Sequence, residues 1–296
     1  MRVRVKKGHV SIAMEAFAEL LEDQLERVER LKENLTPVDY TICNPIIIGI
    51  TGGDGIGPAI TNAAKDVLAF LLKEPVSAGK IIFKDIEGLT IENRAKVNKA
   101  IPDDVLAQLK ECHVILKGPT TTPQAGDQWP NVESANVAMR KELDLFANVR
   151  PVRVPDKGLD WTFFRENTEG AYAVGSKGIH VTDDLAVDFT ITTTQGSERI
   201  IRAAFEYARQ NGKKRVTAVT KANVVKTTDG KFLNIAKEIS KDYPEIELDD
   251  WYVDIMSAKL IDEKRRNQFQ VLVIREQLFG LQHIIRFKVV LNIRQQ

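Results

Sequence analysis

The stretch IIIGITGGDGIGP, residues 46–58, places an isoleucine-rich run directly before a glycine-rich turn. A short apolar run bounded by a turn is typical of a buried strand. Pro58 then opens a helical pattern that continues to about Leu72, and proline is well tolerated in the first turn of a helix. Strand, tight turn and helix form the repeating unit of α/β proteins. We therefore predict that this stretch begins a mainly parallel, helix-covered sheet.

Further strands and helices alternate on both sides of this unit. A helical repeat of apolar residues at 11–35 (Ile12, Phe17, Leu20, Leu21, Leu25, Val28 and Leu31) predicts an N-terminal helix packed on the body or on a partner subunit. We expect further strands at 80–84, 114–116, 216–219 and 251–253, and helices that end near 110 or span 198–210 and 235–242. The Thr- and Val-rich runs at 179–182 and 186–194 indicate β-hairpins instead.

The glycine-rich turn resembles a dinucleotide fingerprint only loosely. Pro58 and Ala59 occupy the region where the last glycine of a GxGxxG pattern would fall. A tight structural turn is therefore an equally good interpretation.

Composition excludes several classes of protein. The chain has 42 Lys and Arg against 41 Asp and Glu, so its net charge of +1 points to neither a nucleic-acid nor a membrane partner. An apolar run of about 18 residues, as a spanning helix needs, is absent from the sequence. Cys43 and Cys112 are too few for a disulfide framework or a metal site. We expect incidental thiols and a cytoplasmic location.

Three arginines occur near uncharged hydrogen-bonding residues. Arg140 follows Ser134 by six residues, nearly two helical turns, so we expect the two roughly on one helix face. Arg150 and Arg165 follow. Guanidinium groups bind carboxylates in bidentate fashion, so this set suits a polyanionic substrate. Surface salt bridges, the commoner role of arginine, are the alternative.

Six ordered segments resemble one known family, from about Ile46 to Phe269. They are GDGIGP (53–58), KGPTTTP (117–123), ESANVAMRKELDLFANVRPV (133–152), FRENTEGAY (164–172), TKANVVKTTDG (220–230) and DDWYVDIMSAKL (249–260). Together they resemble the isocitrate/isopropylmalate dehydrogenases, the metal-dependent β-decarboxylating dehydrogenases. The resemblance implies an α/β fold with a large parallel-sheet domain and a smaller α/β domain that carries a β clasp.

The resemblance also suggests domain boundaries. We expect an N-terminal helical extension at 1–44 and the N-terminal part of the large domain at 45–147. The small domain would span 148–270, with the clasp at about 171–198. Residues 271–296 would form a divergent tail in place of the rest of the large domain.

Functional roles follow for ten residues. The resemblance implies that substrate is bound by Thr122, Ser134, Asn136, Arg140, Arg150 and Arg165. It places Thr121 and Thr122 beside the cofactor, NAD or NADP, with a weak preference for NAD. Tyr172 would deliver a proton to the enol left by decarboxylation. From a neighbouring subunit, Lys221 would assist removal of the hydroxyl proton and Asp254 would ligate Mg²⁺ or Mn²⁺, so a homodimer with shared active sites is expected.

The implied activity is the oxidative decarboxylation of isocitrate to 2-oxoglutarate and CO₂. Ser134 and Asn136 favour isocitrate over isopropylmalate, because an isopropyl group needs an apolar surface there. Other β-decarboxylating dehydrogenases, acting on homoisocitrate or isopropylmalate, are an alternative, and a non-catalytic regulatory subunit is another.

The resemblance fades after Val273. The family continues with an "NLxGD" word whose two aspartates complete the metal site, whereas this chain has Leu281 in that region and no aspartate after Asp262. We expect a coding frameshift near 273–276, with a genuine shortened paralogue as the alternative. Hard cations need several oxygen ligands, so we expect the chain to be inactive by itself.

Overall fold

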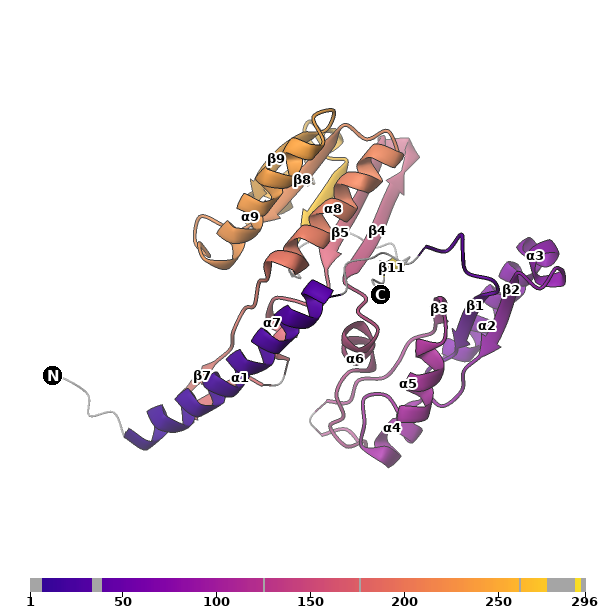
Figure 1. Ribbon diagram of the computed structural model, residues 1–296, viewed down its shortest axis with the longest axis horizontal. Helices are drawn as coiled ribbons and strands as arrows, with labels where there is room; N and C mark the ends of the chain where they lie inside the picture. Colours follow the sequence, from indigo (N-terminus) through magenta and orange to yellow (C-terminus); the bar gives the residue numbers. More distant parts are fainter. Residues whose placement is uncertain are drawn as a thin grey trace. The chain divides into compact units, whose positions relative to one another are not determined.

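A computed structural model describes residues 7–33, 39–124, 126–175, 177–260, 262–275 and 291–293 (Figure 1). The chain divides into two compact units. The three-stranded unit comprises Pro37–Asp144, and the six-stranded unit comprises Met1–Thr36 together with Leu145–Gln296. One unit boundary thus falls three residues before the expected boundary at 147/148. The assignment of these units to a large and a small domain stays a prediction.

The three-stranded unit confirms the parallel sheet expected from residues 46–58. Its strands are β1 (Ile46–Thr51), β2 (Ile81–Asp85) and β3 (Val114–Lys117), in the order β2-β1-β3 and all parallel. Its helices are α2 (Gly57–Leu71), α3 (Lys73–Ser77), α4 (Ile91–Val97), α5 (Asp103–Lys110) and α6 (Ala135–Glu142). Because the strands are parallel, their carboxyl ends share one edge of the sheet.

The second unit contains a mixed sheet in the order β11-β4-β5-β10-β8-β9. Its strands are β4 (Ala147–Val154), β5 (Leu159–Glu166), β8 (Arg215–Thr220), β9 (Glu247–Tyr252), β10 (Val271–Ile274) and β11 (Leu291–Ile293). Strands β5, β10, β8 and β9 are parallel, whereas β4 runs antiparallel to both β5 and β11. The first four residues of the expected divergent tail thus form β10, an inner strand of this sheet.

Two apolar clusters cover the two faces of this sheet. On β10, Val271 and Val273 pack with α8 (Thr194–Gln210) and α9 (Thr228–Ile239), which lie over one face (Figure 1). Leu272 and Ile274 pack on the other side with residues of α10 (Val253–Leu260). A parallel strand buried on both faces is apolar throughout, which explains the continuous VLVI run. The short helices of this unit are η1 (Pro155–Lys157), α7 (Ala171–Val174), η2 (Ser240–Asp242) and η3 (Arg266–Gln268).

The expected clasp region is only partly strand. β6 (Ile179–Thr182) pairs antiparallel with β7 (Leu185–Val187). The prediction of strand from 186 to 194 is wrong beyond Val187, apart from a single bridge between Ile191 and Gly170. Helix α8 begins earlier than expected because the Thr193 hydroxyl accepts a hydrogen bond from the Gly196 N–H at 2.9 Å and so caps the helix.

The N-terminal helix is present as α1 (Lys7–Glu33) and contacts β6 and α8. Leu20 and Leu31 are buried, as predicted, but Ile12, Leu21 and Leu25 are exposed. Leu21 is rotated by about 100° from Leu20 around the helix axis. The predicted apolar face, which contained both residues, was therefore wider than the face that is buried. The helix therefore packs on its own chain through a narrow face.

Two further observations bear on the composition. Among the described helices, none combines the length and apolarity that crossing a membrane requires. Neither Cys43 nor the buried Cys112 forms a disulfide in the described part of the chain.

Candidate active site

Two glycine-containing turns of the three-stranded unit cross at van der Waals contact. A Cβ added at Gly57 or at Gly118 would lie 2.0 or 1.9 Å from the carbonyl oxygen of Gly52. These glycines are therefore needed for the close approach of backbone to backbone. Their packing supports the interpretation of GGDGIGP as a tight structural turn.

Asp54, in the first of these turns, fixes the position of Thr121. Its carboxylate accepts hydrogen bonds from the backbone N–H of Ile91 at 2.7 Å and of Thr121 at 2.6 Å. Its own N–H donates to the carbonyl of Pro119 at 2.8 Å. Sequence reasoning assigned no role to Asp54, although it lies inside a motif that carried the family resemblance.

Arg94 is a second positioning residue that sequence reasoning missed. It is fully buried and donates to three backbone carbonyls, those of Ala100 at 2.8 Å, Thr121 at 2.7 Å and Glu133 at 2.8 Å. Burial lowers the pKa of its guanidinium, which the charge of Asp54 partly opposes. Arg94 thus ties the Thr121 loop to the start of α6. Arg94 follows the buried Ile91 by three residues, so both lie on one face of α4. This spacing was the sequence signal that could have indicated a buried arginine.

The structure brings Thr122 and Ser134 together, with 3.4 Å between their hydroxyl oxygens. Ser134 is the residue before α6 and has an extended backbone, whereas Asn136 and Arg140 lie within the helix. The prediction that Ser134 shares a helix face with Arg140 is therefore wrong, because Ser134 is not helical. Thr121 and Thr122 are exposed on the loop that follows β3.

Lys117, at the end of β3, is a further cation on this edge. Its Nζ donates to the Gly118 carbonyl at 2.7 Å and to the Thr120 hydroxyl at 3.2 Å. Burial, and then the charges of Arg94 and Arg140, lower the pKa of Lys117 to about 8, against an opposing effect of Asp54.

A cavity of about 530 Å³ lies at the carboxyl ends of β1 and β2. Gly52, Gly53, Asp85 and Glu87 are among its lining residues. Open α/β sheets bind nucleotides in crevices at this edge. The cavity therefore lies at the edge where such sheets bind nucleotides, and Thr121 and Thr122 follow the carboxyl end of β3 at the same edge.

In the six-stranded unit, Arg150, Arg165 and Tyr172 form one cluster. Asn148 on β4 is opposite Arg165 on β5, and the Asn148 side-chain oxygen accepts a hydrogen bond from Arg150 Nε at 2.7 Å. The guanidinium of Arg165 lies 5.0 Å from the centre of the Tyr172 ring, a cation–π distance. The pKa of Arg150 is lowered by burial and by the charge of Arg165, with a smaller opposing effect of Tyr172.

The Arg165 guanidinium is buried without a full set of partners. The residue is 7% exposed, and its Nε and Nη2 atoms are buried with no hydrogen-bond acceptor in the described part of the chain. Buried polar groups are normally satisfied, and each exception needs an explanation. A second arginine beside it makes an anionic ligand the natural partner.

Lys221 and Asp254 form a separate pair. They follow β8 and β9, and Lys221 Nζ donates to Asp254 Oδ1 at 2.7 Å. Strand β10 separates β8 from β5 in the sheet, so the pair lies on the far side of β10 from the strand that carries Arg165. Both groups stand at the carboxyl edge of the parallel strands.

The described residues do not fit a divalent cation. They contain no group of three His, Cys, Asp or Glu side chains arranged to hold a metal. Asp254 is the one predicted ligand, and its carboxylate is paired with Lys221. The expected loss of the remaining ligands concerns residues after 275, which lie outside the described residues apart from 291–293.

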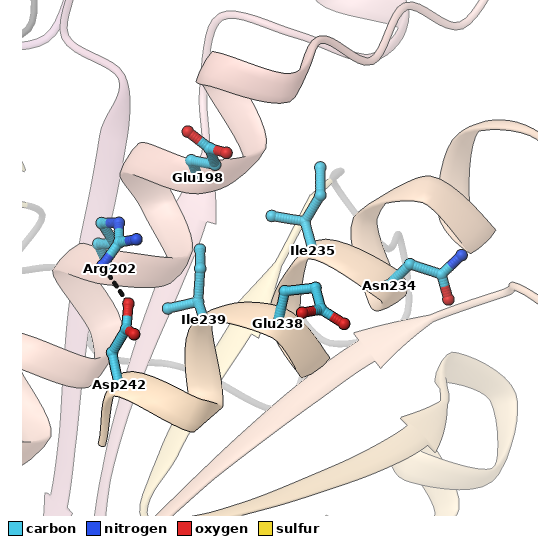
Figure 2. Close-up of a pocket in the computed structure, with 7 residues that line it drawn as sticks. All are labelled: Glu198, Arg202, Asn234, Ile235, Glu238, Ile239 and Asp242. Atoms are coloured by element: carbon cyan, nitrogen blue, oxygen red, sulfur yellow. Dashed lines mark hydrogen bonds and ion pairs between the residues drawn. The ribbon is translucent and has the colours of Figure 1, made fainter.

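A second cavity, of about 280 Å³, lies between α8 and α9 (Figure 2). Its lining includes Glu198, Glu238 and Asp242, and its arginine, Arg202, is paired with Asp242 at 3.0 Å. None of the predicted site residues lines it. An acidic surface of this kind does not suit a polycarboxylate.

The comparisons with known proteins agree with this geometry. The sequence model of isocitrate/isopropylmalate dehydrogenases matches residues 47–281. A homoisocitrate dehydrogenase of Methanocaldococcus jannaschii is 38% identical over 245 residues, which cover 77% of this chain and 66% of that protein. Regulatory subunit 1 of the mitochondrial NAD isocitrate dehydrogenase of Arabidopsis thaliana is 35% identical over 237 residues, which cover 77% of this chain and 59% of that one.

A solved isocitrate dehydrogenase from Methylococcus capsulatus has the same fold. It superposes with a TM-score of 0.64 at 36% identity and covers 79% of this chain and 67% of its own. The chain belongs to the isocitrate/isopropylmalate dehydrogenase family. Members of this family are dehydrogenases that generally use NAD(P) and a divalent metal.

The matches cover only part of the relatives and only part of this chain. The chain covers 66% and 59% of the length of the two relatives named above. The family match begins at Ile47, after α1, and extends to 281, twelve residues beyond Phe269 where the resemblance was expected to end.

Proposed function

We propose that this chain binds isocitrate as a subunit of an NAD(P)-dependent isocitrate dehydrogenase. The buried guanidinium of Arg165 beside Arg150 carries the proposal, because two adjacent cations with no described carboxylate partner are costly. Substrate carboxylates would offset that cost through charge-assisted hydrogen bonds. Arg140 of the three-stranded unit is proposed as the third arginine that binds substrate.

Substrate choice is assigned to Ser134 and Asn136. The Ser134 hydroxyl, already near that of Thr122, would hydrogen-bond the carboxylate that distinguishes isocitrate. An isopropylmalate enzyme would place apolar side chains there. Homoisocitrate, the substrate named for the relative from M. jannaschii, stays the alternative within the same chemistry.

The chain's own residues supply orientation and proton transfer. The arginines would hold the substrate carboxylates. The hydroxyl of Tyr172, whose ring lies under the Arg165 guanidinium, would protonate the enol after CO₂ is lost. Lys221 of a neighbouring subunit would assist removal of the proton from the substrate hydroxyl, once its hydrogen bond to Asp254 is replaced by one to that hydroxyl. When bound, NAD(P) supplies the hydride acceptor, and the cavity at the ends of β1 and β2 would hold part of the nucleotide.

A non-catalytic subunit is the second candidate. Its support is the Lys221–Asp254 pair together with the lack of a three-ligand cluster among the described residues. One relative at 35% identity is named a regulatory subunit. Such a subunit would bind isocitrate and activate a complete partner. Turnover by the purified chain alone would exclude this candidate.

We further propose that the subunits act in pairs. The family resemblance assigns Lys221 and Asp254 to the site of a neighbouring subunit, and this assignment is compatible with their place across β10 from Arg165 in the same sheet. Light scattering on the purified chain, alone and with a full-length homologue, measures this association. A monomer under both conditions would contradict the proposal.

The test of isocitrate binding is titration calorimetry. Isocitrate, homoisocitrate and isopropylmalate are titrated into the wild type, Arg150→Ala and Arg153→Ala. Arg153 is the matched control, because it lies on the same strand but is exposed and pairs with Asp160 at 3.3 Å. Isocitrate should bind best, and Arg150→Ala should weaken it by at least about tenfold, since the loss of one member of a buried charge pair costs roughly 2–5 kcal/mol. Equal binding to Arg150→Ala and Arg153→Ala would overturn the proposal.

A further inference from the structure

Helix α1 places an arginine against the FRENTEGAY segment. Arg27 Nη1 lies 3.3 Å from Glu169 Oε1, and its Nη2 donates to the Thr168 hydroxyl at 3.2 Å. The Glu169 side chain is fully buried, and that of Arg27 is 17% exposed. Helix α1 lies before residues 47–281, which the family model matches, so this contact joins a helix outside the matched range to a segment inside it.

The carboxylate of Glu169 also contacts the start of α8. It accepts hydrogen bonds from the N–H of Thr193 at 3.1 Å and from the Thr193 hydroxyl. A Cβ at Gly196 would lie 2.1 Å from Glu169 Oε1, so any side chain at that position would displace the carboxylate. The positive end of the helix dipole stabilises a carboxylate placed there. Glu169 is thus held between α1 and α8.

A second buried carboxylate completes the cluster. Glu166 accepts hydrogen bonds from the Thr168 N–H at 2.8 Å and the Thr168 hydroxyl at 2.6 Å. The same hydroxyl accepts a hydrogen bond from Arg199 Nη2 at 2.9 Å. Thr168 therefore receives donors from both Arg27 and Arg199 while it donates to Glu166.

This cluster lies directly between two residues of the candidate active site. Glu166 is the last residue of β5, next to Arg165, and Gly170 precedes α7, which carries Tyr172. The backbone from 166 to 170 consequently sets how the Arg165 guanidinium stands over the Tyr172 ring. In this fold Arg165 and Tyr172 cannot keep their geometry if that backbone shifts.

We propose that Arg27 is a positioning residue, through which the docked helix α1 holds the 166–170 segment and so orients Arg165 and Tyr172 for a polycarboxylate substrate. This inference rests on the proposed function only for the identity of that substrate. The role of Arg27 in holding the segment stands separately.

Charge balance supplies the physical reason. Two buried carboxylates, Glu166 and Glu169, face two guanidiniums, Arg27 and Arg199. Burial and the charge of Glu169 raise the pKa of Glu166 to about 7, and Arg199 opposes the shift. Without Arg27 the cluster carries one uncompensated negative charge. Either one of its carboxylates takes up a proton, or water enters the cluster and the 166–170 segment moves.

The experiment compares three variants of the full chain: Arg27→Met, Arg27→Lys and Arg30→Met. Arg30 is the matched control, because it is on the same helix but exposed and paired only with Glu26 at 3.8 Å among described residues. Isocitrate affinity is measured by calorimetry, and amide hydrogen exchange of residues 167–175 is measured without ligand. Arg27→Met should bind isocitrate about tenfold more weakly and exchange faster at 167–175, whereas Arg27→Lys should keep most of both properties and Arg30→Met all of them.

A double-mutant cycle tests whether Arg27 acts through Glu169. In a Glu169→Gln background, Arg27→Met should change affinity little further, because the charge that Arg27 balances is gone. Gly196→Ala is a second route to the same effect, since it displaces the carboxylate and leaves α1 intact. If Arg27→Met matches Arg30→Met in both measurements, or alters exchange without altering affinity, the proposal is wrong. If the wild type binds no isocitrate, the proposed function fails, and an unchanged exchange rate at 167–175 would still overturn the role of Arg27.

Discussion

Lys221 and Asp254, which the family resemblance assigns to proton transfer and to metal binding, are bonded to each other at 2.7 Å within one chain. The hydrogen bond from Lys221 lowers the pKa of the Asp254 carboxyl below its usual value. The carboxylate is charged at neutral pH, but its charge is already compensated.

The pair therefore predicts weak metal binding. Asp254 is a single carboxylate among the described residues, and hard cations need several oxygen ligands. The purified chain should bind Mn²⁺ only at about millimolar concentrations, as measured by electron paramagnetic resonance. Lys221→Met should tighten binding by freeing Asp254, whereas the neighbouring Lys226→Met, a change at an exposed lysine, should not. Micromolar binding by the wild type that disappears in Asp254→Asn would contradict this account.

Arg94 predicts a large effect on stability. Its guanidinium satisfies three backbone carbonyls in the interior of the three-stranded unit. Arg94→Met should lower the free energy of unfolding by about 3 kcal/mol, at roughly 1 kcal/mol for each hydrogen bond. Urea unfolding measures this, with the exposed Arg30→Met as control. A change within about 0.5 kcal/mol, the range of ordinary surface substitutions, would show that water replaces these bonds.

The lowered pKa of Lys117 predicts that the stability of the folded chain depends on pH. Its pKa is about 8 in the folded chain against an ordinary value of 10.5, so the folded chain binds fewer protons between these values than the unfolded chain. Stability must then rise with pH over that interval. Relative to Lys117→Met, which cannot titrate, the wild type should gain stability from pH 8 to 10 in urea titrations. A difference that is flat or falls with pH would show that Lys117 is not perturbed.

Arg140 predicts an effect on substrate affinity. It lies in the last turn of α6, and its positive charge contributes to the lowered pKa of Lys117. Loss of one member of a buried charge pair costs roughly 2–5 kcal/mol, so Arg140→Ala should weaken isocitrate binding by at least about tenfold. The adjacent Lys141→Ala, an exposed position, should bind normally in the same calorimetric titration. Indistinguishable affinities would remove Arg140 from the substrate site.

Local patterns were sufficient for most elements of the fold. The apolar run before Gly52 correctly predicted β1. The errors occurred where a distant contact decided the outcome. Thr193 caps α8 while it also bonds Glu169, so the expected strand through 194 became a helix start. The inward face of α1 was likewise chosen by its contacts with β6 and α8.

Ordered motifs were enough to identify the family and the residues expected to bind substrate, because residue type and spacing along the chain carry that information. They did not reveal Arg94, whose three acceptors lie up to 39 residues away, or Arg27, which meets Glu169 across 142 residues. Such contacts depend on which helix face is buried and on where a glycine leaves space for a carboxylate. Those outcomes follow from packing and charge compensation in the folded chain, so only the tertiary structure decided them.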